Sequence, residues 1–409
     1  MNNTKTILAT AYAINPYKGS EDGMGWNFVM QIARNNRVIA VTRENNEKDI
    51  QSYMSEYPSD VYKNIQFIYF DLPYWQRFWK KGGRGAMLYY LLWQNRLVNF
   101  IKDLKLQFDI SHNLNFHNDW TPSFLWKLNK PMVWGPVGHH PKIPAQYLNH
   151  YEKKYWVKDR LTWITKLFFW KYSKSLRKTI NKSDHILCMN NSVPEKLQLD
   201  SSKLSVMPSV ATDDQGYASK RSSRKFTLLS AGRLVPLKGF DLSINAFSGF
   251  LNKLSFEDQS KCELIIVGKG PEKEKLSDLC HKLGIQNHVT FIDWIERQKL
   301  MDYYRESSAF LFPSHEGAGM VVAEALSFGL PVICLDNSGP GEFVDQLCGY
   351  PVPMQDYKGT VSQLSDSICE IYNDPKKLKV LSNNARKKFE DKFHWDRRGE
   401  SLSKIYSKL

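Results

Sequence analysis

Two carboxylates, Glu316 and Glu324, stand eight positions apart in the stretch PSHEGAGMVVAEALSFGLPVI. Three small residues, Gly317, Ala318 and Gly319, follow the first acid, and helix-forming residues begin near Met320. The first amides of a helix have no acceptor inside it, and small side chains let an anion come close to them. The stretch therefore predicts a phosphate-binding helix start with an acid on either side.

The two acids are expected to differ in role. Glu324 is surrounded by valine, alanine and leucine, and a carboxylate in apolar surroundings needs hydrogen-bonding partners. We expect it to accept hydrogen bonds from two ribose hydroxyls. Glu316 comes before the helix, where a sugar beyond the phosphates would lie. The alternative is a helix-dipole partner and a helix-surface acid.

Two cations, Arg233 and Lys238, stand five positions apart in SAGRLVPLKGFDL, between an apolar strand and a helix that begins near Phe240. A guanidinium fork and an ammonium point charge at this spacing can converge on one diphosphate. Two solvated loop cations are the alternative.

Length and composition indicate a globular protein of two or three domains, because the chain has 409 residues and 42% hydrophobic content. The six cysteines form no CxxC pair and are read as buried free thiols. No apolar run is long enough for a transmembrane helix, and the start lacks the features of a signal peptide, so we expect a cytoplasmic protein. The net charge of +14 favours anionic partners: nucleotides, nucleic acid or an anionic membrane surface.

Short apolar runs alternate with helix-like segments in two successive rounds, which is typical of doubly wound α/β domains. A polar stretch over residues 209–224 is read as the linker between them. The predicted domains are residues 1–212 and 213–392. Ligands of such sheets bind beyond the carboxyl ends of the strands. The runs read as strands are TILATAYAI, RVIAVT, IQFIYF, FDISHN, PMVWGP and HILCMN in the first round, and KFTLLSAG, CELIIVGKG, HVTFIDW, SAFLFPS and LPVICLD in the second.

The order GRLVPLKG, VGKGPE and PSHEGAGMVVAEALSFGLPVI resembles the nucleotide-binding domain of family 4 glycosyltransferases, which have the GT-B architecture. Glu316 and Glu324 match the family's Glu-x(7)-Glu signature, and Arg233 and Lys238 match its Arg-x(4)-Lys pair. The resemblance implies two Rossmann-like domains facing across a cleft, with a C-terminal helix over residues 393–409 crossing back to the first. It also implies a nucleotide-sugar donor, retention of anomeric configuration, and no metal or other cofactor.

The first domain carries a weaker resemblance. The glycine-rich turn GSEDGMGWNF, with Gly23 and Gly25, resembles the loop that approaches the donor phosphates and the acceptor in such enzymes. FDISHNLNFHNDWTPSFLWKL followed by PMVWGPVGHHPKIP resembles a subgroup that acts in bacterial surface-polysaccharide assembly. His112 matches the cleft histidine beside the transferring sugar, and His117 is the competitor. Many relatives have a second glycine where this chain has His139, which leaves the acceptor-side role of His139 and His140 open.

The expected function is that of a retaining glycosyltransferase that uses a nucleotide-sugar, with UDP preferred on base rates. The acceptor would be a glycan or a lipid-linked glycan of capsule, O-antigen or exopolysaccharide biosynthesis. Glu316 and His112 would orient the sugar, and the nucleobase would lie against residues 293–295, ending at Ile295. The alternatives are a nucleotide-sugar 2-epimerase of the same fold and a membrane-peripheral scaffold with a vestigial nucleotide site.

Two basic stretches rich in aromatic residues, residues 73–105 and 151–182, fit an anionic inner-membrane surface. Ordinary amphipathic helices that pack their aromatic side chains into the core are the alternative. No recognised nucleic-acid-binding motif occurs, so nucleic acid is not an expected partner.

Overall fold

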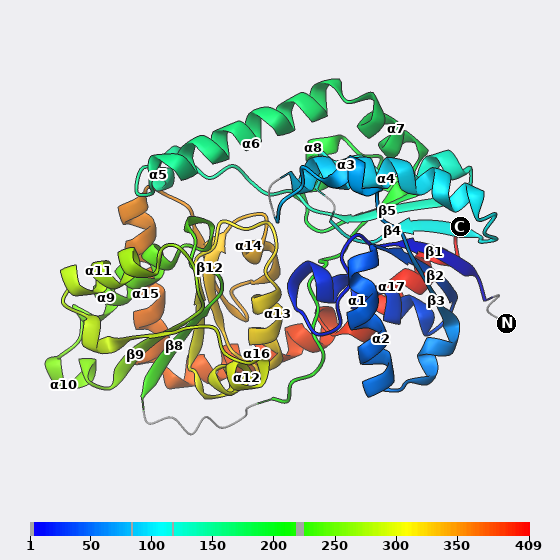
Figure 1. The fold of residues 1–409 in the computed structure, drawn as a ribbon. Helices are drawn as coiled ribbons and strands as arrows, with labels where there is room; N and C mark the ends of the chain where they lie inside the picture. Colours follow the sequence, from blue (N-terminus) through cyan, green and yellow to red (C-terminus); the bar gives the residue numbers. More distant parts are fainter. Residues whose placement is uncertain (1–3, 83–84, 117, 218–224) are drawn as a thin grey trace. The chain divides into compact units, whose positions relative to one another are not determined.

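The computed structural model describes residues 4–82, 85–116, 118–217 and 225–409. These residues form two compact units, each built around one parallel sheet with helices on its faces (Figure 1). The first unit comprises residues 1–139, 164–209 and 395–409, and the second comprises residues 140–163 and 210–394. The predicted α/β class with two doubly wound sheets is confirmed.

The first unit has a seven-stranded parallel sheet in the order β3-β2-β1-β4-β5-β6-β7. Its strands are β1 (Thr6–Thr10), β2 (Arg37–Thr42), β3 (Ile65–Tyr69), β4 (Ile110–Asn113), β5 (Met132–Val137), β6 (His185–Cys188) and β7 (Leu204–Val206). Its helices are α1 (Ser20–Ala33), α2 (Glu47–Glu56), α3 (Tyr74–Arg77), α4 (Ala86–Asp103), α7 (Lys174–Lys182), α8 (Ser192–Leu197) and α17 (Trp395–Tyr406).

The second unit has a six-stranded parallel sheet in the order β10-β9-β8-β11-β12-β13. Its strands are β8 (Phe226–Ala231), β9 (Cys262–Val267), β10 (Val289–Ile292), β11 (Ala309–Phe312), β12 (Val332–Asp336) and β13 (Gly349–Pro353). Its helices are α5 (Ala145–Leu148), α9 (Phe240–Leu251), α10 (Phe256–Gln259), α11 (Lys273–Lys282), α12 (Arg297–Glu306), α13 (Met320–Ser327), α14 (Pro340–Phe343), α15 (Tyr357–Asn373) and α16 (Pro375–Lys392).

Both sheets reverse their strand order once, between β1 and β4 in the first unit and between β8 and β11 in the second. In a doubly wound sheet this reversal opens a crevice at the carboxyl ends of the two central strands, because their following helices leave to opposite faces. The fold therefore singles out the loops that follow β8 and β11 in the second unit.

Apolar side chains cover both faces of the second sheet. One buried cluster joins α9, α11 and α15 to the sheet, and another joins α12, α13 and α16 to its other face. Strands enclosed on both faces are continuously apolar, which explains why β11 reads AFLF.

The C-terminal helix α17 belongs to the first unit, where it packs on α1. The rings of Phe28 and Trp395 meet edge to face at 5.5 Å. At the other end of α17, the Tyr406 hydroxyl lies 2.5 Å from Nδ1 of His112 in β4.

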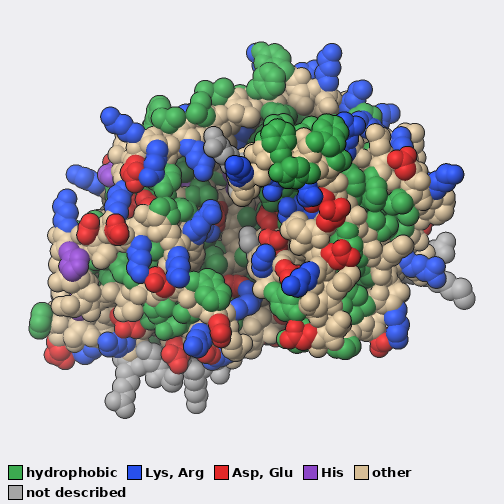
Figure 2. All heavy atoms as spheres, in the orientation of Figure 1, with side chains coloured by type: hydrophobic (Ala, Val, Ile, Leu, Met, Phe, Trp, Pro, Cys, Tyr) green, Lys and Arg blue, Asp and Glu red, His purple; other side chains and the backbone are tan. Residues whose placement is uncertain are grey.

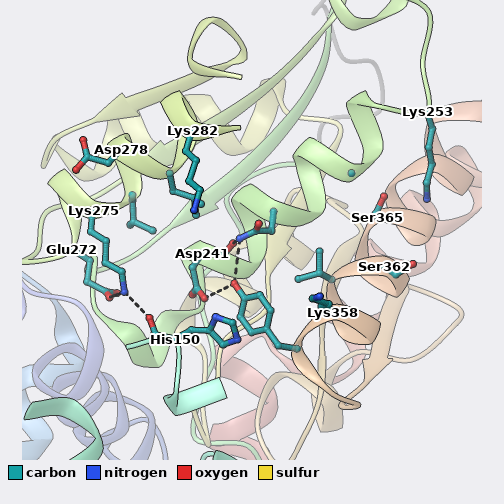
Figure 3. A pocket seen from close by; sticks show the side chains of 16 residues that line it. His150, Asp241, Lys253, Glu272, Lys275, Asp278, Lys282, Lys358, Ser362 and Ser365 are labelled. Atoms are coloured by element: carbon teal, nitrogen blue, oxygen red, sulfur yellow. Dashed lines mark hydrogen bonds and ion pairs between the residues drawn. The ribbon is translucent and has the colours of Figure 1, made fainter. Parts of the chain in front are cut away.

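Residues 140–163 pack with the second unit, whereas the sequence placed them in the first domain. The unit boundary falls inside α6 (Lys153–Tyr172). Tyr151 donates a hydrogen bond to Asp241 in α9 at 2.9 Å. Lys275 in α11 donates one to the His150 carbonyl at 2.8 Å (Figure 3). These contacts join sequence-distant segments, so no local pattern could have assigned them. Residues 218–224 of the predicted linker lie outside the described residues.

The six cysteines are free, and all except Cys369 are buried, as predicted. Within the described ranges, we find no helix that combines the length and the apolar character needed to cross a bilayer.

Candidate functional site

The loops that follow β8 and β11 lie against each other in the second unit. The amide of His315 donates to the Leu237 carbonyl at 2.9 Å, and the Ser314 hydroxyl donates to the same oxygen at 3.1 Å. Gly239 has φ +67°, and a Cβ at this position would lie 2.1 Å from the Pro313 carbonyl oxygen. Only glycine permits both this conformation and this approach, so the KG pair in the sequence is needed to bring the loops together.

This packing joins one predicted cation to one predicted acid. Lys238 closes a short 3-10 turn (Pro236–Lys238), and its Nζ lies 2.7 Å from Oε2 of Glu316. Both side chains are mostly buried, with 17% and 20% exposed. The sequence assigned Lys238 to the diphosphate and Glu316 to the sugar, whereas in the structure each neutralises the other.

Arg233 is exposed on the same loop. Across the described ranges of the chain, its side chain makes no ion pair or hydrogen bond. An uncommitted guanidinium beside the Lys238 turn is available to an anionic ligand.

The start of α13 offers donors without a side-chain cap. Gly319 precedes Met320, the first residue of the helix, and no side chain accepts from the helix start. Within the described part of the chain, the amides of Ala318 and Gly319 have no acceptor. The amide of Gly317 donates to Nδ1 of His140 at 3.1 Å. A helix start of this kind, next to Lys238, can hold a phosphate group.

Glu324 is buried in the second turn of α13, as its apolar neighbours predicted. Its Oε1 lies 2.8 Å from Nη2 of Arg297, and the Tyr304 hydroxyl donates to Oε2 at 3.4 Å. Burial raises the pKa of the Glu324 carboxyl, and the Arg297 guanidinium opposes that shift. Sequence reasoning missed Arg297 and Tyr304, although Arg297 follows the predicted nucleobase segment by two residues.

Ile295 lies in the loop between β10 and α12, half-buried against the apolar cluster that includes Phe312. It is therefore close in sequence to the Arg297 that holds Glu324.

His112 does not lie where the sequence placed it. It belongs to β4 itself, paired with Ala9 and Val133, and none of its surface is exposed. Nε2 lies 2.8 Å from the Gly135 carbonyl oxygen and Nδ1 contacts Tyr406, so both ring nitrogens are engaged. Burial lowers the pKa of His112 to about 3. A neutral imidazole without exposed surface cannot touch a substrate, so the catalytic assignment of His112 is not carried forward. The competitor His117 lies outside the described residues.

Gly23 and Gly25 also differ from expectation, because they lie inside α1 rather than in a turn before it. A Cβ at Gly23 would lie 2.3 Å from the Lys18 carbonyl oxygen, and one at Gly25 would lie 2.1 Å from that of Ala13. These glycines therefore let the loop after β1 pack on the helix, which is a sufficient reason for their presence.

The adjacent histidines His139 and His140 belong to different units. In the first unit, Nδ1 of His139 lies 2.8 Å from Oδ2 of the buried Asp119. In the second unit, His140 contacts the Gly317 amide. His140 thus touches the predicted phosphate site, a role that sequence reasoning left open. Among the described residues, no group of three or more histidine, cysteine or acidic side chains could hold a metal ion.

Part of the chain is similar to known glycosyltransferases. Residues 213–388 match the family model described as glycosyl transferases group 1. An uncharacterized glycosyltransferase of Methanocaldococcus jannaschii is 26% identical over 181 residues, 44% of each chain. The GDP-mannose-dependent alpha-(1-6)-phosphatidylinositol monomannoside mannosyltransferase of Mycobacterium tuberculosis is 27% identical over 185 residues, 43% of this chain and 46% of that protein. The matched region thus spans less than half the length of these curated relatives.

The fold as a whole also has solved counterparts. The structure of Anabaena HepE in complex with UDP aligns over 99% of this chain and 100% of that chain, with a TM-score of 0.64 and 14% identity. Residues 213–388 therefore resemble the glycosyl transferases group 1 family, and the chain as a whole has the α/β GT-B fold.

Proposed function

We propose that this chain is a retaining glycosyltransferase, which transfers a sugar from a nucleotide-sugar to a glycan or lipid-linked acceptor in bacterial surface-polysaccharide assembly. The observation that carries the proposal is the joining of two loops at the reversal point of the second sheet. They bring Lys238, Glu316 and the uncapped start of α13 together. The family match covers both loops.

In the proposed reaction, the bond between the anomeric carbon and the diphosphate oxygen breaks, and a bond from the acceptor hydroxyl oxygen to that carbon forms. The acceptor proton passes to a phosphate oxygen of the leaving group. Negative charge concentrates on the diphosphate as it departs, so donors preset around it stabilise the transition state. Lys238, Arg233 and the amides at Ala318 and Gly319 supply this charge compensation, and the proposal therefore needs no metal ion.

Glu324 would accept from the ribose hydroxyls, and the nucleobase would lie beside Ile295. UDP is the proposed nucleotide, since the Anabaena neighbour was solved with UDP. The mycobacterial relative is named for GDP-mannose, so GDP is the nucleotide to compare with it.

His140 replaces His112 as the histidine of the proposed donor site, because its Nδ1 already contacts the Gly317 amide. An approaching phosphate would compete with the imidazole for that amide. His140 would then turn toward the side of the site where the sugar lies. Glu316 would be released on the same side, once the diphosphate takes its place at Lys238.

A peripheral membrane contact is proposed for the first unit. Tyr74, Trp75 and Phe78 are 76%, 70% and 60% exposed, and Figure 2 shows hydrophobic side chains gathered over α3 with lysine and arginine beside them. Trp93 of the same basic stretch is instead fully buried. The stretch therefore divides between the core and a surface patch.

A cavity of about 560 Å³ next to this patch contains three cations, Arg43, Arg77 and Lys80, together with Tyr74 and Phe78. One acid, Asp71, faces them and pairs with Arg77 at 3.0 Å. Exposed aromatics beside excess positive charge suit an anionic lipid surface. We propose the cytoplasmic face of the inner membrane as the location.

The test is incubation of the purified protein with radiolabelled UDP-, GDP- and ADP-sugars, with and without a membrane lipid extract, in the presence of EDTA. Label transferred to lipid or glycan supports the proposal. Conversion of the donor without acceptor would indicate an epimerase, and binding without turnover would indicate a scaffold. Lys238→Ala is expected to lower turnover by about 10²–10³-fold, as loss of one charge-stabilising donor typically does. Lys376→Ala, an exposed lysine on α16, is the matched control.

A further inference from the structure

The second unit contains a cavity of about 710 Å³ that shares no residue with the loops of the proposed donor site. Helices α9, α11 and α15 form its walls, and His150 closes one end (Figure 3). α9 lies between the other two helices and contacts both. A volume of this size is typical of small-molecule pockets, which hold roughly 300–1,000 Å³.

Three acids line this cavity, Asp241, Glu272 and Asp278, against four lysines. Asp241 accepts hydrogen bonds from the hydroxyls of Tyr151 at 2.9 Å and Tyr357 at 2.8 Å. Glu272 is buried, and burial together with the nearby Asp241 raises its pKa to about 7. Asp278 is exposed on α11. The lining therefore has a net positive charge near neutral pH.

Two of the four lysines in the lining are uncommitted. Lys253 pairs with Asp366 at 2.6 Å, and Lys275 donates to the His150 carbonyl. Within the part of the chain that the structure describes, Lys282 on α11 and Lys358 on α15 have no ion pair or hydrogen bond. Figure 3 shows Lys282 reaching from α11 toward the space around Asp241, while Lys358 comes from the other side of the cavity.

The lining also includes the apolar side chains Leu276, Leu279 and Val361. Gly249 on α9 has no side chain there, and a Cβ at this position would lie 3.1 Å from the Ser365 hydroxyl oxygen. That hydroxyl is buried, and it has no hydrogen-bonding partner among the described residues.

We propose that this cavity is a second ligand site, separate from the donor site, for a small organic anion with an apolar or aromatic body. The anionic group would lie between Lys282 and Lys358, and the body would contact Leu276, Leu279 and Val361. A divalent cation does not fit, because the uncommitted charges are positive. A neutral apolar compound would leave both ammonium groups without a counter-charge.

The test compares two fluorescent probes of nearly equal shape, 1-anilinonaphthalene-8-sulfonate, which is anionic, and N-phenyl-1-naphthylamine, its neutral counterpart. The full chain should bind the anionic probe saturably, and UDP should not displace it from this site. Lys282→Glu/Lys358→Glu should remove this class of site or weaken it by at least about tenfold, since contacts to charged groups are lost. Lys376→Glu/Lys379→Glu, which makes the same charge change at exposed positions of α16, should leave it unchanged.

Equal anionic-probe binding by the wild type and by Lys282→Glu/Lys358→Glu would overturn the proposal. Equal affinity of the wild type for the neutral and the anionic probe would overturn it as well. Displacement by UDP would assign the probe to the donor site instead. None of these results depends on transferase activity. If the second ligand site is disproved, the proposed transferase function is unaffected and is tested separately.

Discussion

Lys238 and Glu316 neutralise each other across the two loops of the proposed donor site, with 2.7 Å between Nζ and Oε2. The pair forms because Gly239 allows the loops to touch, and it sits beside the uncapped start of α13. A diphosphate that enters this site must compete with Glu316 for the lysine. The acid is therefore both a predicted sugar contact and an internal competitor of the leaving group.

Glu316→Gln is accordingly expected to bind UDP more tightly while turning over the donor more slowly. Removal of a partly exposed ion pair of this kind changes the free energy by about 1 kcal/mol, which corresponds to about fivefold in affinity. Calorimetric titration with UDP, paired with initial rates on the donor, measures both effects. Glu306→Gln, an exposed acid on α12, is the control, and unchanged or weaker UDP binding by Glu316→Gln contradicts the competition.

Arg297→Gln is expected to make nucleotide binding depend on pH. Burial already raises the pKa of Glu324, and only Arg297 and Tyr304 oppose this shift. Without the guanidinium the pKa should rise further, so the variant should hold more of this carboxyl protonated at pH 6 than at pH 8. An extra shift of one unit corresponds to about tenfold. UDP affinity of the variant should therefore be lower at pH 6 than at pH 8, by a larger factor than in the wild type.

Thermal-shift titrations with UDP at the two pH values measure this dependence. Arg297→Lys keeps the positive charge and should restore most of the pH 6 affinity. If Arg297→Gln binds UDP more tightly at both pH values, Arg297 blocks the access of UDP to Glu324. A role of Arg297 in positioning Glu324 is then excluded.

His112→Gln is expected to affect acid stability rather than catalysis. The folded pKa of about 3 lies below the ordinary value of 6.5, so the unfolded chain takes up a proton that the folded chain excludes. The stability due to the neutral imidazole is present above about pH 6.5 and is lost as pH falls toward 3. Between pH 7 and pH 5 this loss amounts to about 2 kcal/mol.

Urea unfolding of the wild type and of His112→Gln at the two pH values isolates this contribution, with the transitions of the two units fitted separately. Glutamine keeps a polar side chain toward Gly135 and Tyr406 but does not titrate. Between pH 7 and pH 5 the variant should therefore lose about 2 kcal/mol less stability than the wild type. Turnover should stay near the wild-type rate. A large fall in turnover with unchanged stability would return His112 to the catalytic site.

The donor loops could be predicted because their chemistry is local. Glycines, prolines and the Lys238 turn follow one apolar run, and Glu316 with its small neighbours follows another. Parallel strands then place such loops at one edge of the sheet. The partners of these residues were not predictable in the same way. Arg297 reaches Glu324, and His140 reaches Gly317, across sequence separations that no spacing rule encodes.

The missed strands have a physical reason as well. β7 has three residues, and β13 reads GYPVP; both lie at sheet edges. An edge strand tolerates proline because one row of its amides faces no partner strand, and such a segment reads as a loop. His112 was misplaced because β4 extends to Asn113, so a residue read as following the strand is paired inside it.

The aromatic patch over α3 is expected to hold the protein on anionic vesicles. Trp75 and Phe78 are exposed, so Trp75→Ser/Phe78→Ser should change stability by less than about 0.5 kcal/mol. Loss of two apolar side chains that would enter the interface should weaken binding to phosphatidylglycerol vesicles by about tenfold or more. Flotation with lipid vesicles, with and without phosphatidylglycerol, measures the effect.

Phe256→Ser/Leu347→Ser removes two equally exposed apolar side chains from the second unit, with 88% and 67% exposed in the wild type, and should bind vesicles like the wild type. Binding should also weaken with added salt, because each basic residue near the surface contributes about 1 kcal/mol and is screened. If both double variants lose binding equally, general hydrophobicity rather than this patch drives adsorption. If neither loses it while salt still releases the protein, the contact is electrostatic, and the exposed tryptophan has another role.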